Sequence, residues 1–210
     1  MKHCPDCGAK LETPLGCGAC GALFSPESTL TPFEVLGLEP SYELGAAELK
    51  KRLLRVSRVV HPDYFGSADA ATRERAERAS ALVNEAHATL ASDRARADWL
   101  VRWLGGPAES EKREMPKRFL LDVLEWNETL ELARGASPGS AERAALVELR
   151  RVLRAQTDEV LATLAARLSP LPERASARLA EARADLNALR YLDNTLAQID
   201  AVELESLRPN

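Results

Sequence analysis

All four cysteines of this chain lie within its first twenty residues, in two pairs that could bind one metal ion. Each pair has the spacing Cys-x-x-Cys, each is followed by glycine, and nine residues separate the two pairs. Two thiolates at this spacing can reach one ion from a tight turn, and the glycine permits the backbone angles that direct amides toward the sulfurs. The pattern predicts a tetrahedral site whose ligands are Cys4, Cys7, Cys17 and Cys20.

Such a site would be structural, because protein ligands fill every coordination position and leave none for water or substrate. Four thiolates favour zinc, although iron could occupy the same ligands. Two disulfides are disfavoured in a reducing compartment, and a thioredoxin-like redox pair would need a βαβ setting that this sequence lacks. We expect His3 to be an exposed neighbour, and we expect the metal to fold a small module, residues 1–27.

The tripeptide His61-Pro62-Asp63 is the second candidate site, and we expect it in a loop between two helices. Residues 46–60 contain no Gly or Pro, and their apolar residues recur at helical spacing. Pro62 should end this helix, and a second helix should begin near Ala70. The first helix carries five positive charges against one negative, mostly away from its apolar stripe: Lys50, Lys51, Arg52, Arg55 and Arg58. Taken alone, these charges would also fit a solvated helix surface.

The C-terminal half has the pattern of a helical bundle. A polar segment, residues 106–116, is typical of a connection between domains. Beyond it, three helical segments are expected at about 117–134, 140–168 and 173–206, separated by short Gly- and Pro-containing loops. Short loops between long helices predict an antiparallel three-helix bundle.

The segment 117–134 differs from the other two because it has two apolar faces at a helical advance of about 100° per residue. One face consists of Phe119, Val123, Trp126 and Leu130. The roughly opposite face consists of Leu120, Leu121, Leu124 and Leu132. A peripheral helix needs only one face for its core, so the other is either covered by the preceding domain or available to a partner. Glu125, Glu128 and Glu131 border this second face.

Composition limits the classes of protein that this chain can belong to. Only 5% of its 210 residues are aromatic, and the abundance of Ala, Leu, Arg and Glu favours helix throughout. A net charge of -4 argues against a dedicated nucleic-acid binder. No apolar run is long enough to span a bilayer, and no signal-peptide core follows the N-terminus, so we expect a cytoplasmic protein without a membrane partner.

Three further segments resemble the J-domain of co-chaperones. Residues 31–38, Thr-Pro-Phe-Glu-Val-Leu-Gly-Leu, resemble its opening, and residues 84–90 and 93–100 resemble its third helix and exit. The exit resembles the HscB branch, the J-domain co-chaperones of iron-sulfur cluster assembly, some of which carry a similar four-cysteine extension. Residues 119–128 follow the HscB pattern Phe-Leu-Met-Glu-Gln-Leu/Met-Glu-Leu-Arg-Glu. The chain departs from the usual residues at Leu121 and Leu132, and at Tyr64, where many J-domains have Lys.

The resemblance implies a mainly α fold with a zinc module at 1–27, a J-domain hairpin at 30–105, a linker at 106–116 and a three-helix scaffold-binding domain at 117–207. It implies no enzymatic activity. The basic helix with His61, Pro62 and Asp63 would stimulate a DnaK/HscA-class chaperone ATPase, and the last domain would bind an IscU-type iron-sulfur scaffold. The scaffold-contact positions would be Leu120, Leu121, Leu124, Glu125, Glu128 and Tyr191.

Two other functions remain open at this point. A general J-domain co-chaperone would use the same loop to deliver unfolded clients, and a thiol oxidoreductase would use the cysteine pairs after loss of the metal. The oligomeric state is expected to be a monomer or a weak dimer.

Overall fold

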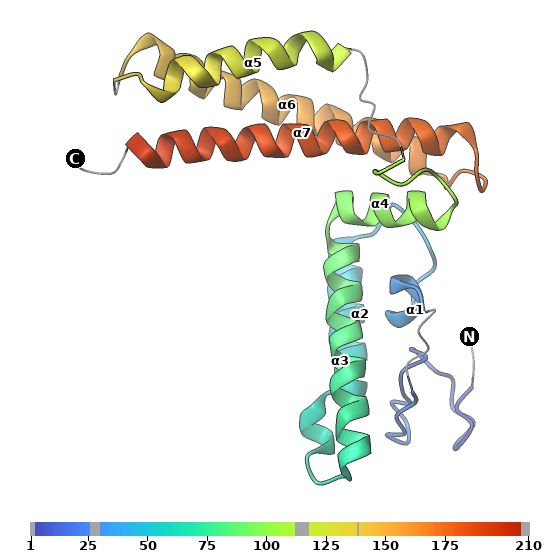
Figure 1. The fold of residues 1–210 in the computed structure, drawn as a ribbon. Coiled ribbons are helices and arrows are strands. Elements are labelled where there is room, and N and C mark those ends of the chain that lie inside the picture. The colour runs from blue at the N-terminus through green and yellow to red at the C-terminus, as the bar shows by residue number, and fades with distance from the viewer. Residues whose placement is uncertain (1–2, 26–29, 112–117, 138, 207–210) are drawn as a thin grey trace. The chain divides into compact units, whose positions relative to one another are not determined.

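The computed structural model describes residues 3–25, 30–111, 118–137 and 139–206. Its helices, shown in Figure 1, are α1 (Pro32–Val35), α2 (Ala46–Val60), the 3-10 helix η1 (Pro62–Phe65), α3 (Ala70–Ala91), α4 (Asp93–Trp103), α5 (Arg118–Arg134), α6 (Ala141–Leu168) and α7 (Ala177–Ser206). Within the described residues, extended pairing is limited to isolated bridges near the N-terminus, such as that between His3 and Lys10. The mainly α prediction is therefore confirmed.

Contacts divide the chain into two compact units, Met1–Trp99 and Leu100–Asn210. The four-cysteine segment belongs to the first unit together with α1, α2 and α3, and the second unit contains α5, α6 and α7. The division falls inside α4, whereas the sequence suggested domain limits at 105 and 117. Among the described residues, no helix is both long and apolar enough to cross a membrane.

The first unit is built on the hairpin of α2 and α3. The apolar stripe of α2 consists of Leu49, Leu53, Val56 and Val60, and all of these are buried except Leu53, which is only partly buried. On α3 the buried row is rich in small side chains: Ala76, Ala79, Val83, Ala86 and Leu90. Small side chains let the two helices approach closely, and helix α1 packs on α3 with Phe33 and Val35 buried.

A buried arginine holds the corner between α3 and α4. The Arg96 side chain donates to the Tyr42 carbonyl at 2.6 Å and to the Leu90 carbonyl at 2.5 Å, and it pairs with Asp93. Its guanidinium also lies over the Tyr42 ring, 5.1 Å from the ring centre. Because a buried cation needs compensating partners, this set of contacts ties the loop before α2 to the end of α3.

In the second unit, α5, α6 and α7 pack on one another in pairs, and Figure 1 shows them running side by side as an antiparallel bundle. The apolar residues that recur at helical spacing along α6 are buried: Leu146, Leu149, Leu153, Val160, Leu164 and Leu168. Helix α7 begins at Ala177, four residues later than predicted, because the residues before it form a turn. There Ala175 has a φ of 55°, and its N–H donates to the Leu104 carbonyl at 2.8 Å.

The first residues of the predicted linker lie against α7. A Cβ on Gly106 would come within 2.8 Å of the Leu179 Cβ, so only glycine fits there without a shift. The buried Arg183 donates from Nε to the Pro107 carbonyl at 2.8 Å. The start of this segment is therefore anchored to the bundle, while residues 112–117 fall outside the described part of the chain.

Candidate functional site

The four cysteine sulfurs form one cluster whose ligand atoms all lie within 4.8 Å of one another. The Cys4 and Cys20 sulfurs are 3.7 Å apart, and so are those of Cys7 and Cys17. With metal–sulfur bonds of about 2.3 Å, as for zinc, a tetrahedron places its sulfurs roughly 3.8 Å apart. The four residues therefore fit one tetrahedral ion, as the spacing predicted.

Both cysteine pairs sit in the same type of backbone turn. The Gly8 N–H donates to the Cys4 carbonyl and the Gly21 N–H to the Cys17 carbonyl, each at 2.9 Å. Both glycines have positive φ angles, 73° at Gly8 and 76° at Gly21, which side-chain-bearing residues adopt at a cost. The predicted role of these glycines is thus seen in the structure.

The electrostatics of the cluster favour a bound cation. Backbone N–H groups of Cys20 and Ala19 at its sulfur lower the pKa of Cys17 to about 7. The Ala22 N–H lowers the pKa of Cys20, but burial and the other three cysteines outweigh it and raise that pKa to about 12. Four thiols this close cannot all ionise unless a positive charge lies among them, and a divalent ion supplies that charge.

The tripeptide 61–63 lies on the surface between α2 and α3. His61 ends α2 with extended backbone angles, φ -63° and ψ 126°, and Pro62 is the first residue of η1. The His61 Nδ1 accepts the Asp63 N–H at 3.3 Å and lies 3.6 Å from the Asp63 carboxylate. The ring of Tyr64 meets the His61 ring edge-on, with centroids 5.9 Å apart, and Tyr64 is 68% exposed.

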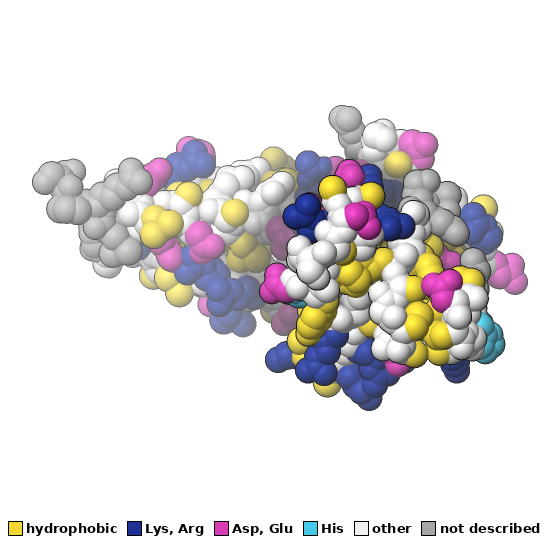
Figure 2. Space-filling view, turned by 90° about the horizontal axis from the view of Figure 1, so that it is seen from below, with side chains coloured by type: hydrophobic (Ala, Val, Ile, Leu, Met, Phe, Trp, Pro, Cys, Tyr) yellow, Lys and Arg dark blue, Asp and Glu magenta, His cyan; other side chains and the backbone are white. Residues whose placement is uncertain are grey.

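The basic residues of α2 differ in how far their charges are already paired. Arg52 and Lys51 lie 2.8 Å and 3.9 Å from the Glu48 carboxylate on the same helix. Lys50 and Arg58 are exposed and have no carboxylate partner among the described residues. Figure 2, which views the molecule from below, shows that Lys and Arg side chains gather in several groups on this surface of the molecule.

Arg55, the fifth basic residue, is paired with the four-cysteine module. Its Nη1 lies 3.1 Å from Glu12 Oε1, and each side chain is 45% exposed. Glu12 could not be identified from the sequence, because a lone acidic residue between two cysteine pairs carries no pattern of its own. Only the fold brings it to a helix more than forty positions away.

Helix α5 presents one of its two apolar faces to the core and the other outward. Phe119, Trp126 and Leu130 are buried in the bundle. On the opposite face, Leu124 is 69% exposed and Leu132 is 60% exposed. Glu125, Glu128 and Glu131 beside them are also exposed, whereas the side chains of Leu120 and Leu121 lie outside the described part of the chain.

Tyr191, the position suggested on the last helix, is half-buried beside this face. Its ring lies 6.1 Å from that of Trp126, and its hydroxyl accepts a long hydrogen bond, 3.5 Å, from Asn127 Nδ2. Trp126 in turn meets Phe119 edge-on at 6.0 Å. The aromatic contact couples α7 to α5 and leaves only part of the Tyr191 ring accessible.

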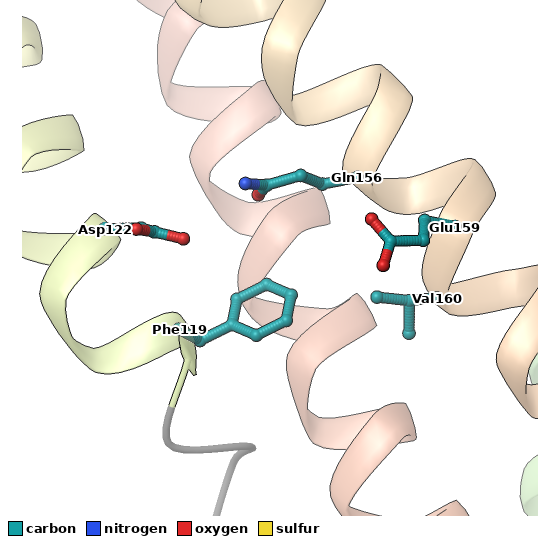
Figure 3. Close-up of a pocket in the computed structure, with 5 residues that line it drawn as sticks. All are labelled: Phe119, Asp122, Gln156, Glu159 and Val160. Atoms are coloured by element: carbon teal, nitrogen blue, oxygen red, sulfur yellow. The ribbon is translucent and has the colours of Figure 1, made fainter.

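A small pocket opens between α5 and α6, as Figure 3 shows. It is lined by Phe119 and Asp122 from α5 and by Gln156, Glu159 and Val160 from α6. None of the site residues expected from the sequence lines it.

Comparisons with known proteins agree with this architecture. A family profile described as "HSCB C-terminal oligomerisation domain" matches residues 115–200. The human iron-sulfur cluster co-chaperone protein HscB is 29% identical over 162 residues, which is 75% of this chain and 66% of the human protein. A co-chaperone protein HscB homolog of Shewanella loihica is 30% identical over 173 residues, 81% of this chain and 96% of that protein. The chain thus spans slightly less than two thirds of the human relative and nearly all of the bacterial one.

Solved structures give the same result. The crystal structure of human co-chaperone protein HscB aligns with a TM-score of 0.75 and 25% identity, covering 97% of this chain and all of that one. Chaperone HscB from Vibrio cholerae aligns with a TM-score of 0.68 over 85% of this chain, and at 24% identity it supports the fold alone.

Proposed function

Because this chain belongs to the HscB family of co-chaperones, we propose that it stimulates the ATPase of a DnaK/HscA-class chaperone and delivers an IscU-type iron-sulfur scaffold protein to it for cluster transfer. The observation that carries this proposal is the exposed His61-Pro62-Asp63 loop at the end of a helix with a basic face. In this role the protein promotes a reaction that another protein catalyses.

At the chaperone end, the basic residues of α2 attract an acidic surface of the ATPase. Lys50 and Arg58, which have no carboxylate partner among the described residues, contribute most to the long-range attraction. Opposite charges raise the association rate, so binding should weaken as salt is added. His61, Pro62 and Asp63 then bias the bound ATPase toward hydrolysis.

At the scaffold end, the exposed face of α5 binds the partner. Leu124 offers apolar area, and Glu125 and Glu128 form an acidic edge that favours a basic rim on the scaffold. Leu120, Leu121 and Tyr191 complete the contact surface in our proposal. Residues 117–207 would form this binding domain, residues 30–105 the J-domain, residues 106–116 the linker and residues 1–27 the metal module.

The four cysteines hold the module together around one ion, and we propose zinc as that ion, with iron as the other candidate for the same ligands. The bound ion would cross-link a module with a small described core cluster, in which Cys4, Leu11 and Cys17 are buried and Ala9, Ala22 and Phe24 pack against them. Metal analysis of the purified protein, together with a count of thiols before and after chelation, distinguishes zinc from iron and both from disulfides.

The decisive experiment is single-turnover ATP hydrolysis by the partner chaperone, first with this protein alone and then with the iron-sulfur scaffold added. If the protein is a dedicated cluster-transfer co-chaperone, it and the scaffold together should raise the rate of ATP hydrolysis by more than the sum of their separate effects. Stimulation that is indifferent to the scaffold would replace this proposal by a general J-domain co-chaperone that delivers unfolded clients.

A further inference from the structure

The segment between the two cysteine pairs, together with Gly18 inside the second pair, contacts α1 and α2. The Thr13 hydroxyl, 2% exposed, donates to the Val35 carbonyl at the end of α1 at 2.9 Å. Gly16 and Gly18 lie against Val59 of α2: a Cβ on them would meet Val59 methyl carbons at 3.0 Å and 3.4 Å. These contacts seat residues 12–18 on the side of the helix that we assign to chaperone binding.

Glu12 is fixed at the edge of this contact by its backbone as well as by its side chain. Its carbonyl oxygen would be only 2.1 Å from a Cβ on Gly37, so the two backbones are in close contact where Gly37 has a φ of 63°. The carboxylate then reaches Arg55 at 3.1 Å. Because the backbone is held, the carboxylate has little freedom to leave the guanidinium.

The ion closes this segment at both ends. Residues 12–16 lie between Cys7 and Cys17, whose sulfurs are 3.7 Å apart, and Gly18 follows Cys17 directly. Joining the ends of a short loop removes most of the conformations that it could adopt when open. Metal binding therefore favours the arrangement in which Glu12 lies beside Arg55.

From these contacts we propose that Glu12 is a positioning residue that sets the charge of the chaperone-binding face, and that metal occupancy controls it. With the ion bound, Glu12 engages Arg55 and lowers the positive potential of α2. When the ion is lost, residues 12–18 are released and Arg55 becomes available to an acidic partner. The inference rests on the proposed function, because it assumes that α2 binds the chaperone.

The test is a double-mutant cycle read by the affinity for a purified DnaK-class chaperone in its ATP-bound state. Glu12→Gln keeps the size of the side chain and removes its charge. It should tighten binding about two- to fivefold, the range expected for one exposed ion pair, and steepen the salt dependence. Arg55→Gln should weaken binding only slightly in the otherwise unchanged protein, but should have a clearly larger effect in the Glu12→Gln background.

Arg58→Gln is the matched control, because Arg58 is exposed and has no carboxylate partner among the described residues. Arg58→Gln should change the affinity for the chaperone by the same factor in the otherwise unchanged protein and in the Glu12→Gln protein. If Glu12→Gln leaves affinity unchanged while Arg58→Gln weakens it, this inference is wrong and the proposed function stands. If neither Arg55→Gln nor Arg58→Gln changes binding in any background, the docking of α2 on the chaperone is itself wrong.

The metal is tested with the same variants, loaded with zinc or treated with a chelator. Chelation should raise the rate of amide hydrogen exchange in residues 12–18. It should also increase the loss of chaperone affinity caused by Arg55→Gln, up to the loss found in the Glu12→Gln protein. If Arg55→Gln lowers chaperone affinity by the same factor with and without zinc, the proposed metal dependence is wrong. Helical content measured by circular dichroism checks that α2 and α3 remain folded in each sample.

Discussion

His61 and Asp63 form a small local structure in which one hydrogen bond selects the tautomer of the histidine ring. Since Nδ1 accepts the Asp63 N–H, it carries no proton in the neutral ring, and the proton is assigned to Nε2. The loop therefore offers an N–H donor beside an exposed carboxylate. The Tyr64 ring lies edge-on to the His61 ring, with centroids 5.9 Å apart.

Replacing His61 by Gln should abolish most of the ATPase stimulation, because the variant loses the ring that holds this arrangement. We expect a loss of at least about tenfold in single-turnover rate, the size associated with one well-placed polar contact. Scaffold affinity and thermal stability should not change, since the His61 side chain is half exposed. His87→Gln, the same substitution on α3, is the control. Equal loss of stimulation and scaffold binding by His61→Gln would point to misfolding.

At the scale of single elements, α5 uses its two apolar faces differently. The face with Trp126 and Leu130 belongs to the core, while Leu124 and Leu132 remain exposed between acidic residues. An exposed leucine on a helix adds little to the stability of the bundle, because it buries little area from water. In our proposal, the scaffold covers this leucine.

Leu124→Ala should therefore weaken binding of the scaffold by about 1–2 kcal/mol, or roughly five- to thirtyfold, the range typical of an apolar contact residue at an interface. The free energy of unfolding should change by no more than about 0.5 kcal/mol. Val147→Ala on α6, where the side chain is 60% exposed in the same bundle, is the matched control. Unchanged affinity in a titration of Leu124→Ala would remove the basis for this docking face.

Helices could be predicted from the sequence wherever their apolar periodicity was strong. The buried stripe from Leu146 to Leu168 and the ending of α2 before Pro62 follow from local patterns. The late start of α7 could not be predicted, because it depends on Ala175 binding the carbonyl of Leu104, seventy-one positions earlier. For the same reason the cysteine cluster was predictable from its spacing, whereas the Glu12–Arg55 pair was not.

At the scale of the whole molecule, the division into two units separates the four cysteines and residues 61–63 from helices α5, α6 and α7. Metal removal should consequently affect only the first unit. We expect chelation to lower the unfolding temperature of that unit, because residues such as Thr13 and Leu15 lose the constraint that keeps them buried. The transition of the bundle should stay in place, as calorimetry or hydrogen exchange can show. A parallel shift of both transitions would contradict this independence.

The pH dependence of metal binding follows from the thiol pKa values. With the pKa of Cys20 raised to about 12, this ligand carries a proton at neutral pH and must release it when the ion binds. Metal affinity should therefore fall by about tenfold or more for each unit by which the pH is lowered below 8. Competition with a chelating dye at several pH values measures the slope, and a pH-independent affinity would exclude the four-thiolate site.

The cysteine segment is an internal repeat, Cys-Pro-Asp-Cys-Gly-Ala at 4–9 and Cys-Gly-Ala-Cys-Gly-Ala at 17–22, and the repeat extends to the hydrogen bonds. In each copy, the backbone carbonyl of the first cysteine accepts the N–H of the glycine at 2.9 Å. The N–H of the same cysteine donates to the carbonyl of the last alanine at 2.8 Å. The two copies are equivalent toward an ion but not toward the protein, since the second lies against Val59 through Gly18. The two copies are therefore anchored unequally, and we expect the first copy to open before the second when the ion leaves.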